Sequence, residues 1–182
     1  MPDKNFKSYE TFKDTTFRNV ELRPANPAEW NDTMKVWRCN GCTFDRFDVL
    51  GSREDCVDVG QATNDCLFDE FVVEPTGQYA VTCKGGSNDN VFRFWLLRGH
   101  GRDVDFEFGN WHTYNFERST GNVIEACRAT DGKPVTYCYR FGCRPTLIDT
   151  HARHLWWRSI GVTVYWWAKF IWHRVLNRPD SF

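Results

Sequence analysis

Three stretches of the chain repeat one pattern: CTFDRFDVL at 42–50, CLFDEFVVE at 66–74 and VFRFWLLRG at 91–99. Their phenylalanines recur every 24 residues, and the same step runs from Val20 through Phe44, Phe68 and Phe92 to Phe116. A constant step over several units predicts a repeat architecture, in which equivalent residues of successive units lie on one another.

Other positions keep the step of 24. One column holds Phe47, Phe71 and Trp95, a second holds Val49, Val73 and Leu97, and a third holds Cys42, Cys66, Asn90, Tyr114 and Cys138. Within each unit, apolar and polar residues alternate over short runs that end in turn residues such as Gly51-Ser52, which is typical of β-strands. Stacked coils about 4.8 Å apart would place these columns in one interior.

The expected fold is therefore all-β: a single-stranded right-handed parallel β-helix of about five coils of 24 residues. We assign residues 1–15 to an N-terminal arm or cap, 16–149 to the β-helix and 150–182 to a C-terminal amphipathic α-helix that is basic and rich in tryptophan. After Gly101 the apolar residues fall one position out of step, which indicates a turn insertion. An antiparallel β-sandwich with accidental spacing is the alternative.

Composition excludes several classes of protein. Thirty of the 182 residues are aromatic, which excludes disorder for most of the chain. There are 23 basic and 24 acidic residues, a balance that does not suit direct nucleic-acid binding. The charge is uneven, however: residues 31–149 carry a net charge of −5 and residues 150–182 a net charge of +4.

The eight cysteines are expected to be reduced thiols packed as small apolar groups. The first residues lack the apolar core of a signal peptide, so we expect no secretion. Cys39 and Cys42 have the spacing of a zinc knuckle but no second pair within reach, so we predict no metal and no cofactor.

The stretch SREDCVDV at 52–59 resembles the acidic strand of polygalacturonase-type glycosidases, and Gly99-His100-Gly101 is similar to their Gly-His-Gly turn. The resemblance implies Glu54 and Asp55 as the catalytic acids and His100 as a supporting residue. However, 45 residues separate Asp55 from His100, nearly two coils. We therefore expect no catalysis, and keep a carbohydrate-binding or carbohydrate-active β-helix as an alternative.

Asp103, Asp105 and Glu107 alternate along one predicted strand, so they would share one face. Three carboxylates in a row could bind Ca²⁺, but a solvated outer face that discourages edge pairing is the favoured interpretation.

The C-terminal segment carries an apolar stripe at helical spacing, with Trp157, Ile160 and Val164 in its first turns and basic residues on the opposite side. Its uncharged part is too short to span a bilayer. The residues predicted to bind a partner are Trp156, Trp157, Arg158, Ile160, Val164, Trp166, Trp167, Lys169, Ile171, Trp172 and Arg174. Capping of the open β-helix end and attachment to a membrane surface are the two alternatives.

Short β-helices of this pectin-lyase-like kind, without a complete catalytic set, resemble virion parts of tailed phages. The resemblance implies a non-enzymatic assembly protein, such as a capsid decoration or tail-associated component, whose partners are copies of itself or other virion subunits. It would be assembled in a reducing cytoplasm and located in the virion. A glycan and a membrane surface are the other partners considered, and direct contact with nucleic acid is not expected.

Overall fold

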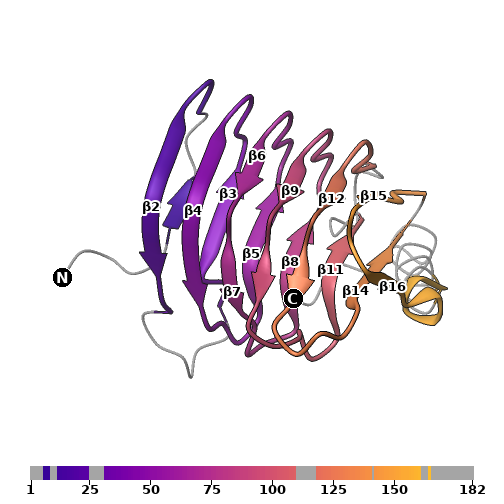
Figure 1. Cartoon of the computed structure of the whole chain (residues 1–182). Helices are drawn as coiled ribbons and strands as arrows, with labels where there is room; N and C mark the ends of the chain where they lie inside the picture. Colours follow the sequence, from indigo (N-terminus) through magenta and orange to yellow (C-terminus); the bar gives the residue numbers. More distant parts are fainter. Residues whose placement is uncertain are drawn as a thin grey trace, which may run out of the picture.

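The computed structural model describes residues 6–8, 12–24, 31–109, 118–140, 142–160 and 164. They form a parallel β-solenoid of about five turns, as the repeat predicts (Figure 1). Every strand pair among these residues is parallel, which rules out the antiparallel sandwich for the described part of the chain.

The coils share three faces. The first face contains β1 (Phe6–Ser8), β3 (Met34–Trp37), β5 (Asp55–Gly60), β8 (Tyr79–Cys83), β11 (Val104–Phe108), β14 (Val135–Tyr139) and β16 (Ala152–His154). The second contains β6 (Leu67–Asp69), β9 (Val91–Arg93), β12 (Val123–Glu125) and β15 (Thr146–Ile148), and the third β7 (Val72–Glu74), β10 (Leu96–Leu97) and β13 (Arg128–Ala129). Two longer strands, β2 (Thr16–Leu22) and β4 (Thr43–Leu50), run along both the second and third faces.

A left-handed backbone residue bends each coil between the second and third faces. The residues at this bend are Asn19, Arg46, Glu70, Phe94 and Ala126, with φ between 49° and 59°. A single residue at positive φ turns the chain sharply and lets extended backbone resume on the next face. The bend therefore recurs at the same place in successive coils.

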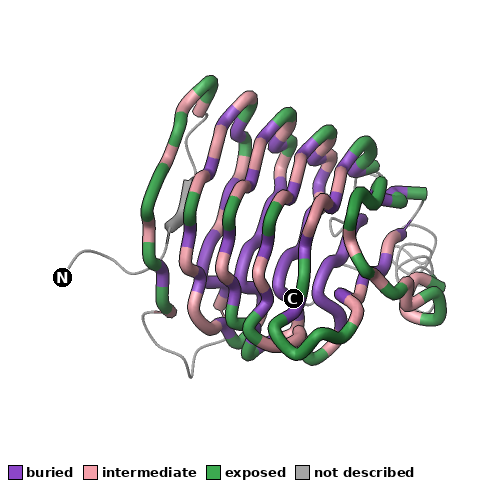
Figure 2. The backbone as a smooth tube through the Cα atoms, viewed as in Figure 1, coloured by how far each residue is buried: buried purple, intermediate pink, exposed green. Residues whose placement is uncertain are grey.

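Two columns of stacked rings fill the interior. In the first, ring centroids are 5.1 Å apart between Phe17 and Phe44, 4.9 Å between Phe44 and Phe68, and 5.1 Å between Phe68 and Phe92. In the second, Phe71 stacks on both Phe47 and Trp95. In Figure 2, buried residues (purple) recur in the successive coils from β4 onward. The like-on-like stacking predicted from the step of 24 is confirmed for these residues.

Both ends of the phenylalanine column differ from the prediction. Val20 pairs with Phe47, and Phe17 takes the place before Phe44. Beyond Phe92 the next partner is Ile124, so the predicted continuation at position 116, which lies outside the described residues, is wrong. The thiol column likewise continues from Asn90 to Asn122, whose Oδ1 accepts the Asn90 N–H, and not to Tyr114 and Cys138.

Two insertions explain the differences beyond Phe92. Val81 pairs with Phe106, 25 residues on, which confirms the predicted extra residue after Gly101. Phe106 then pairs with Tyr137, 31 residues on, because the connection that follows β11 is longer. Within the longer coil the strands keep their parallel register, so each insertion changes a turn and leaves the stack intact.

A ladder of polar side chains closes the turn between the first and second faces. The Asn90 side chain accepts the Cys66 N–H at 3.1 Å and donates to Thr63 O at 2.9 Å and to Asn122 Oδ1 at 3.1 Å. Ser87 accepts the Thr63 N–H in the same way. Buried turn backbone must be hydrogen-bonded, and these side chains supply partners that the turn lacks.

The C-terminal part begins as a continuation of the solenoid. Ala152–His154 forms β16 and pairs with β14, and a short helix starts at Trp156, within the segment predicted to be helical. Residues 156–160 and 164 are its described part. In Figure 1 this segment lies at the end of the stack, beyond β16.

Candidate functional site

The acids and the histidine suggested by the glycosidase resemblance do not meet. Asp55 starts β5 and pairs with Tyr79, which pairs with Val104, so two strand spacings, about 10 Å, separate the level of Asp55 from that of β11. His100 precedes β11 and contacts Asp105 and Asp131. The predicted separation of Asp55 and His100 along the stack is confirmed.

Asp55 lies instead in a buried charged cluster on the outer side of the first face. Lys84 Nζ is 3.1 Å from Asp58 Oδ1 and 3.9 Å from Asp55 Oδ2. Lys35 Nζ is 2.6 Å from Asp32 Oδ2 and 3.7 Å from Asp58 Oδ2. The Asp32 side chain also accepts the backbone N–H of Asp55 at 3.0 Å. This charged cluster ties three successive coils together.

Burial is the largest influence on the pKa values of the charged cluster. It raises the pKa of Asp55 well above its usual range, although Lys84 opposes the shift, and it raises the pKa of Asp58. Burial acts to lower the pKa of Lys84, but the Asp58 and Asp55 carboxylates outweigh it, and the pKa is raised. Half-buried Glu54 also has a raised pKa, from burial and from the charge of Asp32. Asp55 and Asp58 are only 3% and 1% exposed, so the cluster does not face an open substrate groove.

The Gly-His-Gly turn joins neighbouring coils. His100 Nδ1 lies 2.9 Å from Asp105 Oδ2 and Nε2 lies 3.2 Å from Asp131 Oδ1. Asp105 also accepts the Gly101 N–H at 2.9 Å. A Cβ on Gly101 would lie 2.4 Å from the Val104 carbonyl oxygen, so the turn requires glycine there. These contacts give the motif a structural role.

The acidic row on β11 is not a solvated face, and that prediction is wrong. Asp105 and Glu107 are buried, and Asp105 accepts the Thr136 N–H while Glu107 pairs with Arg140. Alternation slips on this face, because the consecutive residues Cys56 and Val57 both belong to the core. A strict alternation of inward and outward side chains therefore assigns some residues of this face to the wrong side.

The cysteines are thiols, as predicted: all eight are free and buried. Burial raises the pKa of Cys66, Cys127 and Cys138 to about 12, so these groups are neutral and poor metal ligands at neutral pH. Within the described residues, no group of three or more His, Cys, Asp or Glu side chains is arranged to hold a metal ion.

The C-terminal helical segment is held to the solenoid by its polar side. Arg158 donates to Asp103 at 2.7 Å, and the Ser159 hydroxyl accepts the Tyr139 N–H at 3.1 Å, just beyond the residues of β14 that β16 covers. Leu155 packs on a small cluster formed by Tyr79, Val104 and Cys138. The segment therefore covers part of the last coil, as the capping alternative requires.

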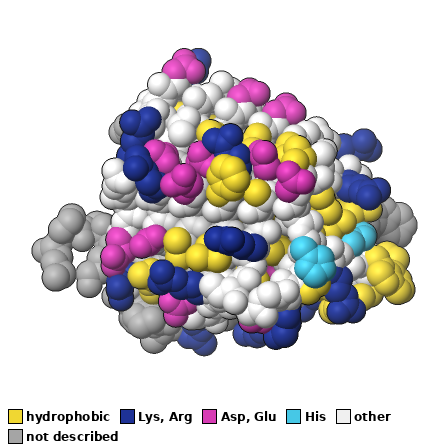
Figure 3. All heavy atoms as spheres, in the orientation of Figure 1, with side chains coloured by type: hydrophobic (Ala, Val, Ile, Leu, Met, Phe, Trp, Pro, Cys, Tyr) yellow, Lys and Arg dark blue, Asp and Glu magenta, His cyan; other side chains and the backbone are white. Residues whose placement is uncertain are grey.

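Its apolar side points away. Trp156, Trp157, Ile160 and Val164 are 62%, 52%, 56% and 60% exposed, and we call these four residues the aromatic face. Figure 3 shows apolar side chains gathered at this end of the molecule. Of the other predicted partner-binding residues, Arg158 is engaged by Asp103, and Trp166, Trp167, Lys169, Ile171, Trp172 and Arg174 lie outside the described residues.

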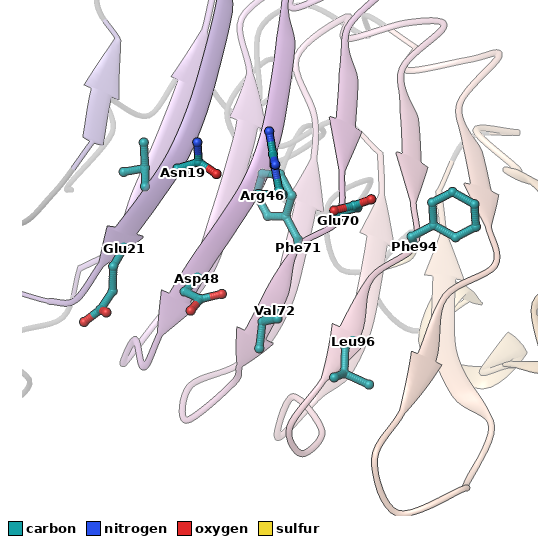
Figure 4. A pocket seen from close by; sticks show the side chains of 10 residues that line it. Asn19, Glu21, Arg46, Asp48, Glu70, Phe71, Val72, Phe94 and Leu96 are labelled. Atoms are coloured by element: carbon teal, nitrogen blue, oxygen red, sulfur yellow. The ribbon is translucent and has the colours of Figure 1, made fainter.

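A shallow groove of about 460 Å³ runs along the bend between the second and third faces. Two rows of side chains follow the stack across four coils: Asn19, Arg46, Glu70 and Phe94, then Glu21, Asp48, Val72 and Leu96 (Figure 4). Val20 and Phe71 complete the lining. This groove was not predicted from the sequence, because the bend depends on positive φ at residues that are not glycine.

No helix in the described part of the chain is long and apolar enough to cross a membrane. In comparisons with known proteins, no family model, no curated protein sequence and no solved structure matches this chain.

Proposed function

We propose that the chain is a non-enzymatic assembly protein, a virion component of the decoration or tail-associated kind, that docks on neighbouring protein subunits through its aromatic face. One observation supports this function above the others. The C-terminal helical segment uses its polar side chains to hold the solenoid and leaves Trp156, Trp157, Ile160 and Val164 exposed.

A helix that served only as a cap would bury its apolar side against the core and expose its polar side. Here the arrangement is reversed. Exposed tryptophans that sit together are favoured anchors of protein interfaces. The rigid, parallel solenoid gives such anchors a fixed position, which suits repeated placement against neighbours.

The carbohydrate-active alternative has less support. Its proposed acid, Asp55, is 3% exposed and forms an ion pair with Lys84. The two ring nitrogens of His100 contact Asp105 and Asp131. Hydrolysis of a polysaccharide that Asp55→Asn abolishes would contradict the non-enzymatic proposal.

The test compares the full-length protein with a double variant, Trp156→Ala with Trp157→Ala, called the tail variant. Sedimentation velocity should show concentration-dependent association of the wild type and its loss in the tail variant, while the two unfold at similar temperatures. The matched control is Leu147→Ala with Ile148→Ala, which removes exposed apolar side chains from β15.

Unchanged association of the tail variant would contradict the proposal. So would a wild type that stays monomeric and co-sediments with vesicles of anionic lipid in a salt-sensitive manner, because that result favours the membrane alternative.

A further inference from the structure

We propose that the groove along the bend is the receptor for the aromatic face of a second copy of this chain, so that copies associate head to tail. The inference rests on the proposed function and names the partner. Its basis is the match in charge, apolar character and length between the groove, which spans β2 to β10, and the C-terminal segment.

The charge of the groove is negative. Its lining contains three acids, Glu21, Asp48 and Glu70, and one base, Arg46. Arg46 already contacts Asp45 at 3.0 Å, and Arg23 contacts Glu21 at 2.8 Å. Among the described residues, neither Asp48 nor Glu70 forms a salt bridge.

The opposite charge lies at the C-terminal end. Residues 150–182 carry five basic side chains and one acidic one. Of the basic residues that the structure describes there, Arg153 is exposed on β16. Complementary charges of this kind steer two copies into one relative orientation and disfavour pairing of groove with groove.

Apolar surface in the groove matches the aromatic face. Phe94 is 52% exposed, an unusual state for a phenylalanine, and Val72 and Leu96 lie beside it, half-buried (Figure 4). Arg93 lies over the Phe94 ring at 5.4 Å from its centroid and is anchored by Asp69, so this end of the groove is held in place. Tryptophan side chains of a partner could cover this apolar patch while basic groups meet the carboxylates.

The lengths also agree. Four coils present a groove about 14 Å long, three strand spacings of about 4.8 Å. In a helix, which rises about 1.5 Å per residue, the stretch from Trp157 to Val164 covers roughly 10 Å. The aromatic face therefore fits within the groove along the axis of the stack.

Because the groove and the aromatic face are different surfaces, a pair would leave one copy with an unused aromatic face and the other with an unused groove. Such a heterologous contact produces open chains or rings, not a closed two-fold dimer. This property makes the proposal testable by complementation.

The experiment uses full-length chains. The groove variant carries Asp48→Lys with Glu70→Lys, and the tail variant is the double tryptophan substitution defined above. A control carries the same change of charge outside the groove, Glu74→Lys with Asp65→Lys, at two exposed acids that do not line it. Circular dichroism and thermal unfolding verify that each variant keeps the wild-type fold.

In sedimentation velocity, we expect the groove variant and the tail variant each to lose self-association by more than about tenfold, and the control to resemble the wild type. An equimolar mixture of the two variants should form a species of two chains, because one supplies an intact groove and the other an intact aromatic face.

Two results would overturn the inference. If the groove variant associates like the wild type while the tail variant does not, the aromatic face docks elsewhere, and the proposed function stands without this receptor. If each variant is monomeric and the equimolar mixture also stays monomeric, the groove and the aromatic face do not bind each other.

Discussion

At the scale of single residues, the stacked phenylalanines are the most sensitive part of the core. Phe68 lies between Phe44 and Phe92, with ring centroids 4.9 and 5.1 Å away, and is fully buried. We expect Phe68→Ala to lower the free energy of unfolding by about 3–5 kcal/mol, because the cavity it leaves cannot collapse between rigid neighbouring coils. Denaturant unfolding measures the change.

Phe94→Ala is the matched control for that substitution. Phe94 is about half exposed at the surface of the next coil, so Phe94→Ala should change the free energy of unfolding by less than about 0.5 kcal/mol. Equal costs at the two positions would contradict the stacked interior.

His100 provides a second residue-scale prediction. Burial acts to lower its pKa, but hydrogen bonds and charges from Asp105 and Asp131 outweigh burial and raise the pKa. The protonated ring can donate to both carboxylates, so its contribution to stability is full below the unfolded pKa of about 6.5 and is lost as pH rises through the higher folded value. Lys133 also faces Asp131 and stays charged throughout this range.

The measurement is the difference in unfolding free energy between wild type and His100→Gln, followed from pH 6 to pH 9. The difference should shrink as pH rises. His154, whose pKa burial lowers, titrates in both proteins and cancels in this comparison. If the difference does not change with pH, protonation of the His100 ring does not stabilise the fold.

At the scale of an element, the outer side of the first face depends on Lys84. Its ammonium group lies between Asp55 and Asp58, which come from the neighbouring strand β5. We expect Lys84→Met to lower the free energy of unfolding by about 3–5 kcal/mol at pH 7, because two buried carboxylates lose the positive charge that faces them. The cost should fall at acidic pH, where Asp55 and Asp58, whose pKa values are raised, become neutral.

Lys133→Met is the control for this element. Lys133 forms a surface pair with Asp131 and its side chain is 72% exposed, so Lys133→Met should lower the free energy of unfolding far less than Lys84→Met. If Lys84→Met is as mild as Lys133→Met, the charged cluster is not a structural tie between coils.

At the scale of the whole molecule, the solenoid is a stack of coils whose turns vary in length. Eleven positions separate Phe108 from Ser119, whereas four separate the equivalent residues Cys83 and Ser87, so the later turn is longer by seven. Deleting residues 111–117 restores the regular step, and loop length has a small effect on stability. We expect a melting temperature within about 4 °C of the wild type.

Deleting residues 110–117 is the matched control. It removes one residue more and leaves the turn too short for Ser119 to reach the Ser87 N–H, so it should melt at a clearly lower temperature than the first deletion. If both deletions unfold the protein, residues 111–117 are part of what stabilises the stack.

The sequence by itself determined the architecture of the interior. Identical partners on successive coils require identical spacing, so the columns of Phe44, Phe68 and Phe92 and of Phe47, Phe71 and Trp95 revealed the solenoid and its strands. The step failed where the turns of successive coils differ in length, because the length of a turn leaves no periodic trace in the residues that follow it.

Only the tertiary structure decided what lies on the outside. Asp105 and Glu107 are buried, although their alternation predicted a solvated row. The groove from Asn19 to Leu96 arises from left-handed bends on successive coils, distant in sequence. Outer surfaces are assembled from residues a coil or more apart, so their contacts depend on register, on the slip in alternation and on turn length, which a local pattern does not encode.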